Sequence, residues 1–250
     1  MRGLSSNFTD ELLGPILARD PAAPLVTYYD DATGERIELS GTTLANWAAK
    51  TANLLRDECD LAQGDRVAVL LPAHWQTLAV MLGVWWCGAQ VCSDPTGVDV
   101  ACCDAARLNV ALDVKAPVVV ALSLNAFGVG LPGLPPGVID YATEVRLHGD
   151  TFVPDEPAAD TAAAATVLDG ADAVTVLTLA RSAAAKAGLG TGDRALTTRD
   201  WSIANGLTGG LVEVPLAVLR AGASLVQCRN VDPAVLDRRA DTERVTHRLD

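Results

Sequence analysis

Two parts of this sequence follow the same strand–helix–strand plan, and the repeat limits the folds that the chain can adopt. The first part, residues 64–92, starts with Gly64-Asp65-Arg66, runs through the apolar segments RVAVLLP and TLAVMLGVWW, and ends in CGAQVC. The second part, residues 192–228, starts with the same Gly-Asp-Arg triplet and ends in AGASLVQC. An unbroken apolar run such as RVAVLLP is typical of a parallel strand that is buried on both faces. We therefore expect an α/β fold with two similar subdomains, each built on a mostly parallel sheet.

Turn residues and periodicity place the elements that precede the first unit. Thr9 is expected to cap a short helix over residues 9–18, and residues 25–40 are expected to form a hairpin. Ser40 is expected to start a helix over residues 41–58, because apolar side chains recur there at helical spacing.

The segments between the two units carry weaker signals. We interpret residues 99–114, which contain Cys102 and Cys103, as a helix, residues 116–123 as a strand, and residues 143–154 as an edge strand. Residues 154–165 have the composition of a surface linker. The domains that we expect are a first α/β subdomain at residues 1–153, a linker at 154–172, and a second, smaller α/β subdomain at 173–250.

Composition excludes several classes of partner. The formal net charge of −12 argues against nucleic acids and anionic membrane surfaces, because these polyanions bind basic patches. The longest apolar stretch, residues 78–92, is shorter than the ~20 residues of a membrane-spanning helix, and the N-terminus lacks the apolar core of a signal peptide. We therefore expect a cytoplasmic protein. The scarcity of lysine and the many alanines indicate a high-GC bacterial genome.

The motifs of several common chemistries are missing. Six cysteines occur without a Cys-x-x-Cys pair or a histidine at ligand spacing, so we expect buried, reduced thiols and no metal site. No basic cluster lies near Cys102 or Cys103 to activate them as nucleophiles. There is no Gly-x-Ser-x-Gly elbow, and no Gly-x-Gly-x-x-Gly turn directly follows a predicted strand. We therefore expect no catalytic residue.

The first unit, with the helix before it, indicates a family. Residues 41–95, GTTLANWAAKTANLLRDECDLAQGDRVAVLLPAHWQTLAVMLGVWWCGAQVCSDP, resemble the N-terminal region of the adenylate-forming superfamily, which includes acyl-CoA synthetases, adenylation domains of peptide synthetases and luciferases. Residues 190–229 resemble the family's segment after its phosphate loop. The whole chain is also similar to a short stand-alone actinobacterial family of that superfamily. The resemblance implies the fold of the family's N-terminal domain, without its C-terminal lid domain.

The segment that should hold ATP departs from the family. Its members bind ATP with a Ser/Thr/Gly-rich loop that ends in Pro-Lys-Gly, in which backbone N–H groups and the lysine face the phosphates. Between residues 165 and 184 this chain has only Gly170 and a lysine is missing, while Asp169 and Asp172 would face the phosphates instead. The linker at 154–172 therefore replaces the phosphate loop.

Two further departures concern the acyl pocket and the later motifs. A gapless reading puts Ser202 and Ile203 where the family has an aromatic–histidine pair, and the later adenine, ribose, hinge and lid-lysine motifs would fall beyond Asp250. The resemblance then implies a scaffold that has lost adenylation, a non-catalytic module that uses no cofactor and binds a small acyl-type ligand or a protein partner. Two alternatives stay open: a ligase fragment that adenylates a carboxylate with ATP and Mg²⁺ when a partner chain completes it, and a homodimeric structural module.

Ligands of open α/β sheets bind at the carboxyl ends of the strands, where two predicted loops should face each other. His74 follows a strand there, either as a ligand contact or general base, or as the first residue of a helix bonded to backbone. We expect a ligand cleft between residues 72–75 and 201–205. Its candidate residues are His74, Trp75, Ser93, Asp94, Trp201 and Asn205.

Overall fold

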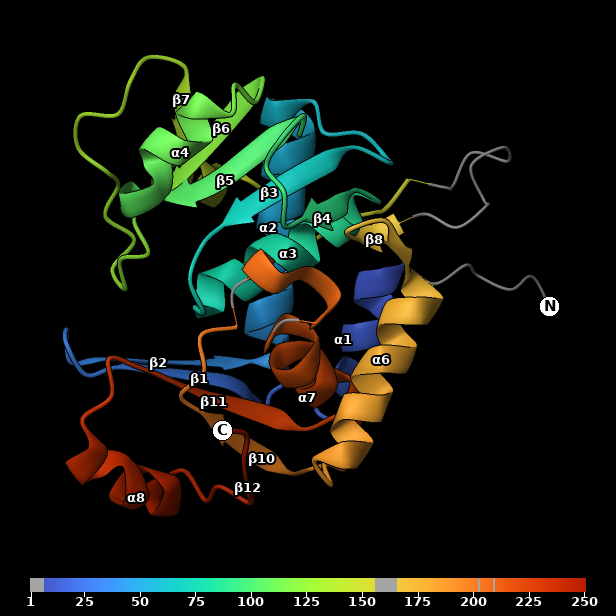
Figure 1. Ribbon diagram of the computed structural model, residues 1–250, viewed down its shortest axis with the longest axis vertical. Helices are drawn as coiled ribbons and strands as arrows, with labels where there is room; N and C mark the ends of the chain where they lie inside the picture. The colour runs from blue at the N-terminus through green and yellow to red at the C-terminus, as the bar shows by residue number, and fades with distance from the viewer. Residues whose placement is uncertain (1–6, 156–165, 202, 209) are drawn as a thin grey trace.

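The computed structural model describes residues 7–155, 166–201, 203–208 and 210–250. Within these residues two sheets lie one above the other, with helices between them and on their outer faces (Figure 1). The upper sheet has the strand order β7-β6-β5-β3-β4-β8-β9, and the lower sheet has the order β12-β10-β11-β1-β2. Neighbouring strands are parallel except in the hairpins β1–β2 and β8–β9. The expected α/β fold with two mostly parallel sheets is confirmed.

The elements have the following bounds. The strands of the upper sheet are β3 (Arg66–Leu70), β4 (Gln90–Cys92), β5 (Val100–Asp104), β6 (Val118–Leu122), β7 (Val138–Asp140), β8 (Thr166–Leu168) and β9 (Ala171–Asp172). Those of the lower sheet are β1 (Pro24–Asp30), β2 (Glu35–Ser40), β10 (Arg194–Thr197), β11 (Ser224–Arg229) and β12 (His247–Arg248). The α-helices are α1 (Phe8–Arg19), α2 (Gly41–Cys59), α3 (Trp75–Trp86), α4 (Leu108–Asp113), α5 (Tyr141–Glu144), α6 (Ala173–Lys186), α7 (Ala217–Ala221) and α8 (Pro233–Thr242).

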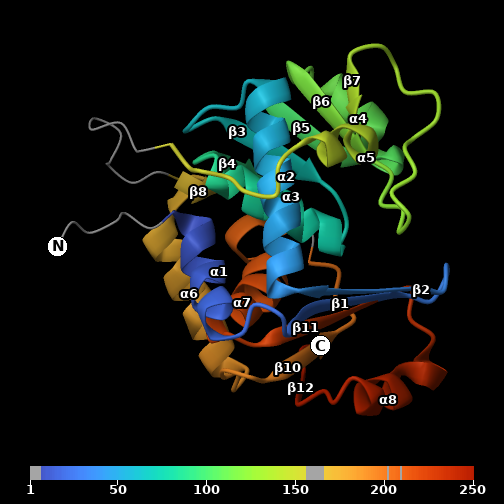
Figure 2. The ribbon, with the colours of Figure 1, turned by 180° about the vertical axis from the view of Figure 1, so that it is seen from behind.

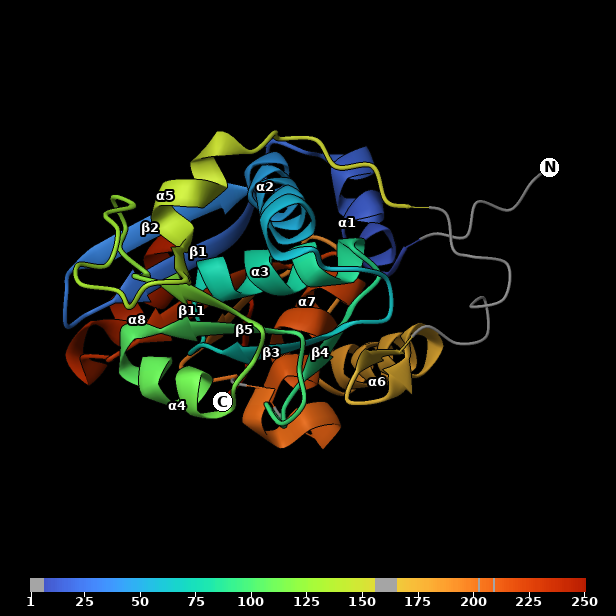
Figure 3. The same ribbon diagram turned by 90° about the horizontal axis from the view of Figure 1, so that it is seen from above.

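The two sheets share one apolar interior. Helices α1, α2, α3 and α7 lie between them, and Figure 3 shows α3 running beside α2 along the inner face of the upper sheet. Successive side chains of a strand point to opposite faces. In β3, Val67 faces this interior, whereas Ala68 packs on the outer face with Ala111 of α4. The outer face of the lower sheet packs against α8 in the same way, through Val226 and Ala240 (Figure 2).

The repeat seen in the sequence extends to individual hydrogen bonds. In each unit the glycine of Gly-Asp-Arg donates to the glycine that ends the following helix, and the aspartate carbonyl accepts from the next strand. The bonds are Gly64 N to Gly88 O (3.0 Å), Gln90 N to Asp65 O (2.9 Å), Gly192 N to Gly222 O (3.2 Å) and Ser224 N to Asp193 O (2.9 Å). Gly64 and Gly192 have φ of +89° and +88°, which glycine adopts without strain. The strand orders β5-β3-β4 and β12-β10-β11 correspond position by position.

The interpretation of residues 99–114 as one helix is wrong. Val100–Asp104 form β5, which lies between β3 and β6 and is buried along its whole length. A short apolar run buried on both faces has no period that separates a strand from a helix. Cys102 and Cys103 therefore lie in a strand and point to opposite faces. The helix starts only after Asp104, whose carboxylate caps the turn Ala105–Arg107.

Two smaller expectations are also wrong. Residues 143–154 do not form the edge strand. The edge strand is β7, and Tyr141–Glu144 turn into α5 because Asp140 caps that helix and the buried Tyr141 hydroxyl bonds Thr51 at 2.8 Å. Thr9 does not cap α1, since Asn7 accepts from Thr9 N and the Thr9 hydroxyl donates to the Leu82 carbonyl inside the core. Ser40 does cap α2, and the hairpin at residues 25–40 forms as expected.

The division of the chain at residues 153 and 173 stays a prediction. The sheets draw strands from both sides of it, because β1 and β2 pair with the later strands of the lower sheet, and β8 and β9 extend the upper sheet. Most of the expected surface linker, residues 156–165, lies outside the described residues.

Candidate functional site

The loops at the carboxyl ends of the strands meet. The loop after β3 is joined to the loop after β10 by a hydrogen bond from Ala73 N to Asp200 Oδ1 at 2.8 Å. The end of β4 is joined to the β8–β9 turn, since Ser93 N donates to Asp169 Oδ1 at 2.7 Å. Gly206 lies against the same turn, because a Cβ there would overlap the Asp169 carboxylate. This edge of the fold is therefore held together by bonds within the chain.

The segment in place of the phosphate loop is a two-residue hairpin turn. Asp169 and Gly170 have φ of +46° and +78°, and Asp-Gly is a favoured sequence for turns with two positive φ angles. Their N–H groups already have acceptors, the Val91 carbonyl at 3.1 Å and Gln90 Oε1 at 3.3 Å. An anion would find no free pair of N–H groups at this turn.

A second carboxylate stands at the start of the helix that follows. Asp172 caps α6 by accepting from Thr175 N at 2.7 Å, and its hydrogen bonds with Thr175 lower the pKa of Asp172 below the ordinary value. A helix N-terminus favours an anion through its exposed N–H groups. Here the side chain of Asp172 supplies that anion.

His74 is the cap of α3. Its Nδ1 accepts from Gln76 N at 3.1 Å, and its ring packs edge-on against Tyr28, with the ring centroids 4.4 Å apart. Burial, together with the nearby Arg229, lowers the pKa of His74 to about 3. The imidazole is therefore neutral at neutral pH and carries its proton on Nε2, because Nδ1 accepts a hydrogen bond. Of the two interpretations made from the sequence, the structure bears out the helix-start histidine bonded to backbone.

The side chains of Glu35, His74 and Trp75 converge where β2 of the lower sheet meets the β3–α3 connection of the upper sheet. We call these three residues the seam cluster. Glu35 Oε1, His74 Nε2 and Trp75 Nε1 are buried, and Glu35 Oε1 lies 3.9 Å from His74 Nε2. Burial and the nearby Asp30 raise the pKa of Glu35, and the hydrogen bond of its carboxylate with the Trp75 indole offsets part of the rise. The sequence did not reveal Glu35, because it lies in a hairpin far from His74 along the chain.

The other candidate residues have local roles. Trp201 is 1% exposed and donates from Nε1 to Gln227 Oε1 at 2.6 Å, so it belongs to the core. Asp94 is exposed and accepts from Thr96 N at 2.9 Å within a local turn. Asn205 lies in the segment Ile203–Thr208, and its side chain is outside the description, as is Ser202. A single cleft lined by all six candidate residues stays a prediction.

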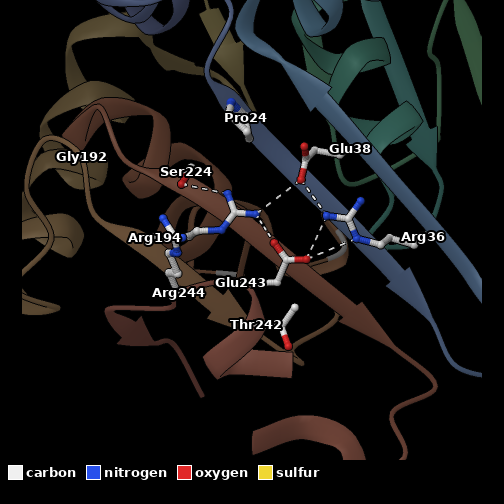
Figure 4. A pocket seen from close by; sticks show the side chains of 9 residues that line it. All are labelled: Pro24, Arg36, Glu38, Gly192, Arg194, Ser224, Thr242, Glu243 and Arg244. Atoms are coloured by element: carbon white, nitrogen blue, oxygen red, sulfur yellow. Dashed lines mark hydrogen bonds and ion pairs between the residues drawn. The ribbon is translucent and has the colours of Figure 1, made fainter. Parts of the chain in front are cut away.

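A pocket of about 650 Å³ lies at the opposite, amino edge of the lower sheet (Figure 4). Glu243, which is 6% exposed, accepts from Arg194 at 2.5 Å and from Arg36 at 3.0 Å, and the Tyr29 hydroxyl donates to it as well. Burial raises the pKa of Glu243, but the hydrogen bonds from Tyr29, Arg194 and Arg36 outweigh burial and lower it. We call these four residues the C-terminal clamp. No local signal in the sequence predicts it, because its members come from three distant segments.

In the described part of the chain, no group of three or more His, Cys, Asp or Glu residues is arranged to hold a metal ion. Burial raises the pKa of all six cysteines, which are free thiols. The helices of the described residues include none with the length and apolar character needed to cross a membrane.

Three solved structures with a similar arrangement are two synthetases and a ligase. An acyl-CoA synthetase of Brucella canis matches 97% of this chain with a TM-score of 0.75 and 18% identity, and the acetoacetyl-CoA synthetase of Streptomyces lividans matches 96% with a TM-score of 0.71 and 17% identity. The anthranilate CoA ligase AuaEII, solved with anthranoyl-AMP, matches 90% with a TM-score of 0.68 and 14% identity. The chain spans 47%, 41% and 45% of these three proteins, respectively, so it has the fold of about half of such an enzyme.

Sequence comparison gives a nearer relative. A search of models of known protein families found no match. A protein of Mycobacterium tuberculosis (strain ATCC 25618 / H37Rv), described as a TIGR03089 family protein, is 52% identical over 243 residues, which are 95% of this chain and 96% of that protein. The chain therefore belongs to the TIGR03089 protein family.

Proposed function

We propose that this chain is a non-catalytic relative of the N-terminal part of adenylate-forming synthetases and acts as a binding module for a small ligand or a protein partner. The fold supports the kinship with those enzymes. The feature that indicates a loss of catalysis is the Asp169-Gly170 turn.

That turn does not fit a triphosphate. Phosphate-binding loops work because successive N–H groups converge on the phosphate oxygens and a lysine or metal ion adds positive charge. Here the two turn amides are bonded to Val91 and Gln90, and the Asp169 carboxylate holds Ser93 N. A phosphate would have to break these bonds and approach a carboxylate, so nucleotide binding would be weak even with Mg²⁺.

Calorimetric titration of the full chain with ATP tests the proposal. We expect no saturable heat with ATP alone or with ATP and Mg²⁺. A matched titration of the Brucella canis acyl-CoA synthetase would show that the conditions allow such binding to be seen. Tight, magnesium-dependent binding of ATP by this chain alone would overturn the proposal.

A second candidate function is a ligase fragment that a partner chain completes. The observation that favours it is coverage, because the chain has the fold of only 41–47% of the synthetases that it matches. Its test is carboxylate-dependent exchange of pyrophosphate into ATP by the chain mixed with the product of a neighbouring gene. Pyrophosphate exchange that requires both chains would favour the ligase fragment. If no exchange occurs with the chain alone or with the mixture, the non-catalytic module would be favoured.

A homodimer is the third possibility, and static light scattering over a concentration series tests it. A monomer mass at every concentration would remove it.

A further inference from the structure

The pocket at the amino edge of the lower sheet, which we call the amino-edge pocket, combines space with an excess of positive charge. It has a volume of about 650 Å³. Its charged lining residues are Arg36, Arg194, Arg244, Glu38 and Glu243, and the other lining residues are uncharged (Figure 4). At neutral pH the lining therefore carries one more positive than negative charge, in a chain whose formal net charge is −12. Such a local excess favours a bound anion.

The two glutamates already have partners, and the arginines keep donors to spare. Glu243 accepts from Arg194 and Arg36, and Glu38 accepts from Arg36 at 2.8 Å. These bonds use Nη2 of both arginines and Nε of Arg36. Arg36 Nη1 has no hydrogen-bond partner among the described residues, and Arg194 Nη1 reaches only Ser224 Oγ, at 3.4 Å. The pocket therefore has N–H groups that can bind a further acceptor.

Arg244 supplies the positive charge that no glutamate balances. Its side chain is exposed and makes no hydrogen bond or ion pair with another residue in the described part of the chain. A guanidinium has five N–H donors in a planar fork, and all of those of Arg244 remain available. The free charge of the pocket thus belongs to one residue.

The backbone at Arg244 is one that favours glycine. Helix α8 ends with hydrogen bonds from Val245 N to Ala240 O (2.9 Å) and from Arg244 N to Asp241 O (3.1 Å), and Arg244 has φ of +53°. This is the Schellman ending, in which the residue with positive φ is usually glycine.

The same ending in other helices of this chain has glycine. The residues at the corresponding positions after α3, α6 and α7 are Gly88, Gly188 and Gly222. An arginine with positive φ costs free energy that glycine would not cost. A strained residue whose charged side chain has no partner within the chain is one that a ligand contact would explain.

The chemistry of the pocket fits a carboxylate. The planar fork of a guanidinium matches the two oxygens of a carboxylate, and the single negative charge of that group matches the excess of one positive charge. A di- or triphosphate would bring additional negative charge against Glu38 and Glu243, which repel it.

We infer that the amino-edge pocket binds one carboxylate group, with Arg244 as its ion-pair partner and Arg36 and Arg194 as further donors. The carboxylate belongs either to a small organic acid or to the C-terminus of a peptide chain. The inference gives the proposed binding module a ligand chemistry and rests on that function only for its purpose. Because the pocket lies at the edge opposite the Asp169-Gly170 turn, the two proposals fail separately.

The test uses the full chain, with acetate as the probe and chloride at equal ionic strength as the control. Each is titrated while the Nε–H resonances of Arg244 and Arg194 are followed by NMR. We expect acetate, but not chloride, to shift both resonances saturably. Inorganic phosphate that bound more tightly than acetate would overturn the assignment to a carboxylate.

Three variants connect the signal to Arg244. Arg244→Gly removes the guanidinium and suits the positive φ, so the protein should remain folded while acetate binding weakens about tenfold or more. Arg244→Lys keeps the charge without the fork and should bind acetate with intermediate affinity. The control Arg181→Ala removes the same charge from an exposed position on α6, outside the pocket, and should change the affinity less than twofold.

A tetra-alanine peptide distinguishes the two sources of the carboxylate. If the peptide with a free C-terminus binds more tightly than acetate and its amidated form does not bind, the site takes a chain end. Acetate binding that equals or exceeds that of the peptide identifies a small acid, and both results support the inference. The inference is overturned if acetate gives no saturable shift, or if Arg244→Gly and Arg181→Ala weaken binding equally, since long-range charge alone would then explain it.

Discussion

The C-terminal clamp offers a severe test of what holds the end of the chain in place. In the variant Glu243→Ala, Arg194 and Arg36 lose their shared carboxylate, and Arg194 is left 14% exposed with only the distant Glu38 carboxylate, at 3.9 Å, as a charged partner. Removing one partner of a fully buried ion pair costs roughly 3–5 kcal/mol, because the other charge stays desolvated. Arg36 is 47% exposed and can rehydrate. We therefore expect a loss of about 2–3 kcal/mol in the free energy of unfolding.

Urea unfolding followed by circular dichroism measures this loss. With a urea dependence of roughly 1–3 kcal/mol per M, the unfolding midpoint should fall by about 0.7–3 M. The control is Glu213→Ala, which removes an ion pair with Arg199 of similar length, 2.7 Å, but with the two side chains 49% and 38% exposed. Such surface pairs contribute less than about 1 kcal/mol. If both variants unfold at the same midpoint, burial does not strengthen the clamp and the reasoning is refuted.

Acid weakens the same clamp. The pKa of Glu243 is lower in the folded protein than its ordinary value of 4.5, so its stabilising effect is present above that value and is lost as pH falls through the folded pKa. The stability gap between the unchanged protein and Glu243→Ala should therefore stay nearly constant from pH 7 down to about 5 and shrink as the pH falls below 4.5 toward the folded pKa of Glu243. A gap that stayed constant below pH 4.5, or widened there, would contradict the assigned contacts.

Three further predictions follow from other contacts. The double variant Asp169→Asn/Asp172→Asn should still give no saturable ATP heat, because the turn amides stay bonded to Val91 and Gln90; strong binding would mean that charge alone excludes nucleotide. Gly83→Ala should lower the melting temperature and cost about 1–3 kcal/mol of stability, because the added Cβ would lie 2.9 Å from Thr51 Cβ. The control Gly14→Ala, which has open space around the added Cβ, should leave the stability unchanged or raise it. The six cysteines should react with a thiol reagent at pH 8 far more slowly in the folded than in the denatured protein, and rapid reaction of several thiols would show that burial does not raise their pKa values.

The parts of the fold that the sequence predicts well are those with local causes. Gly64 and Gly192 adopt positive φ angles, and Ser40 caps α2 through its own side chain. The apolar side chains of β3 favour a position inside a sheet. Each of these signals lies within a few residues of the structure that it specifies. The helix expected over residues 99–114 failed for the opposite reason, because the strand β5 is defined by its neighbours β3 and β6.

The candidate sites show the same limit. Position at the carboxyl end of a strand drew attention to His74 and Trp75, but their environment depends on Glu35, which comes from the hairpin of the other sheet. Trp201 looked like a cleft residue and is a core residue, because its indole is satisfied by Gln227 from β11. Contacts between segments that are distant in sequence leave no pattern in a single chain, so neither the seam cluster nor the C-terminal clamp could be predicted.

The backbone N–H groups in the loops at the carboxyl edge already have hydrogen-bond acceptors, which argues against a phosphate site there. In open α/β sheets this edge binds ligands because strand ends leave N–H and carbonyl groups free in the loops that follow. Here Ala73 N is bonded to Asp200, Ser93 N to Asp169, and the Asp169 and Gly170 amides to Val91 and Gln90. Polar groups that already have partners offer a ligand little net free energy, since each new bond replaces an old one.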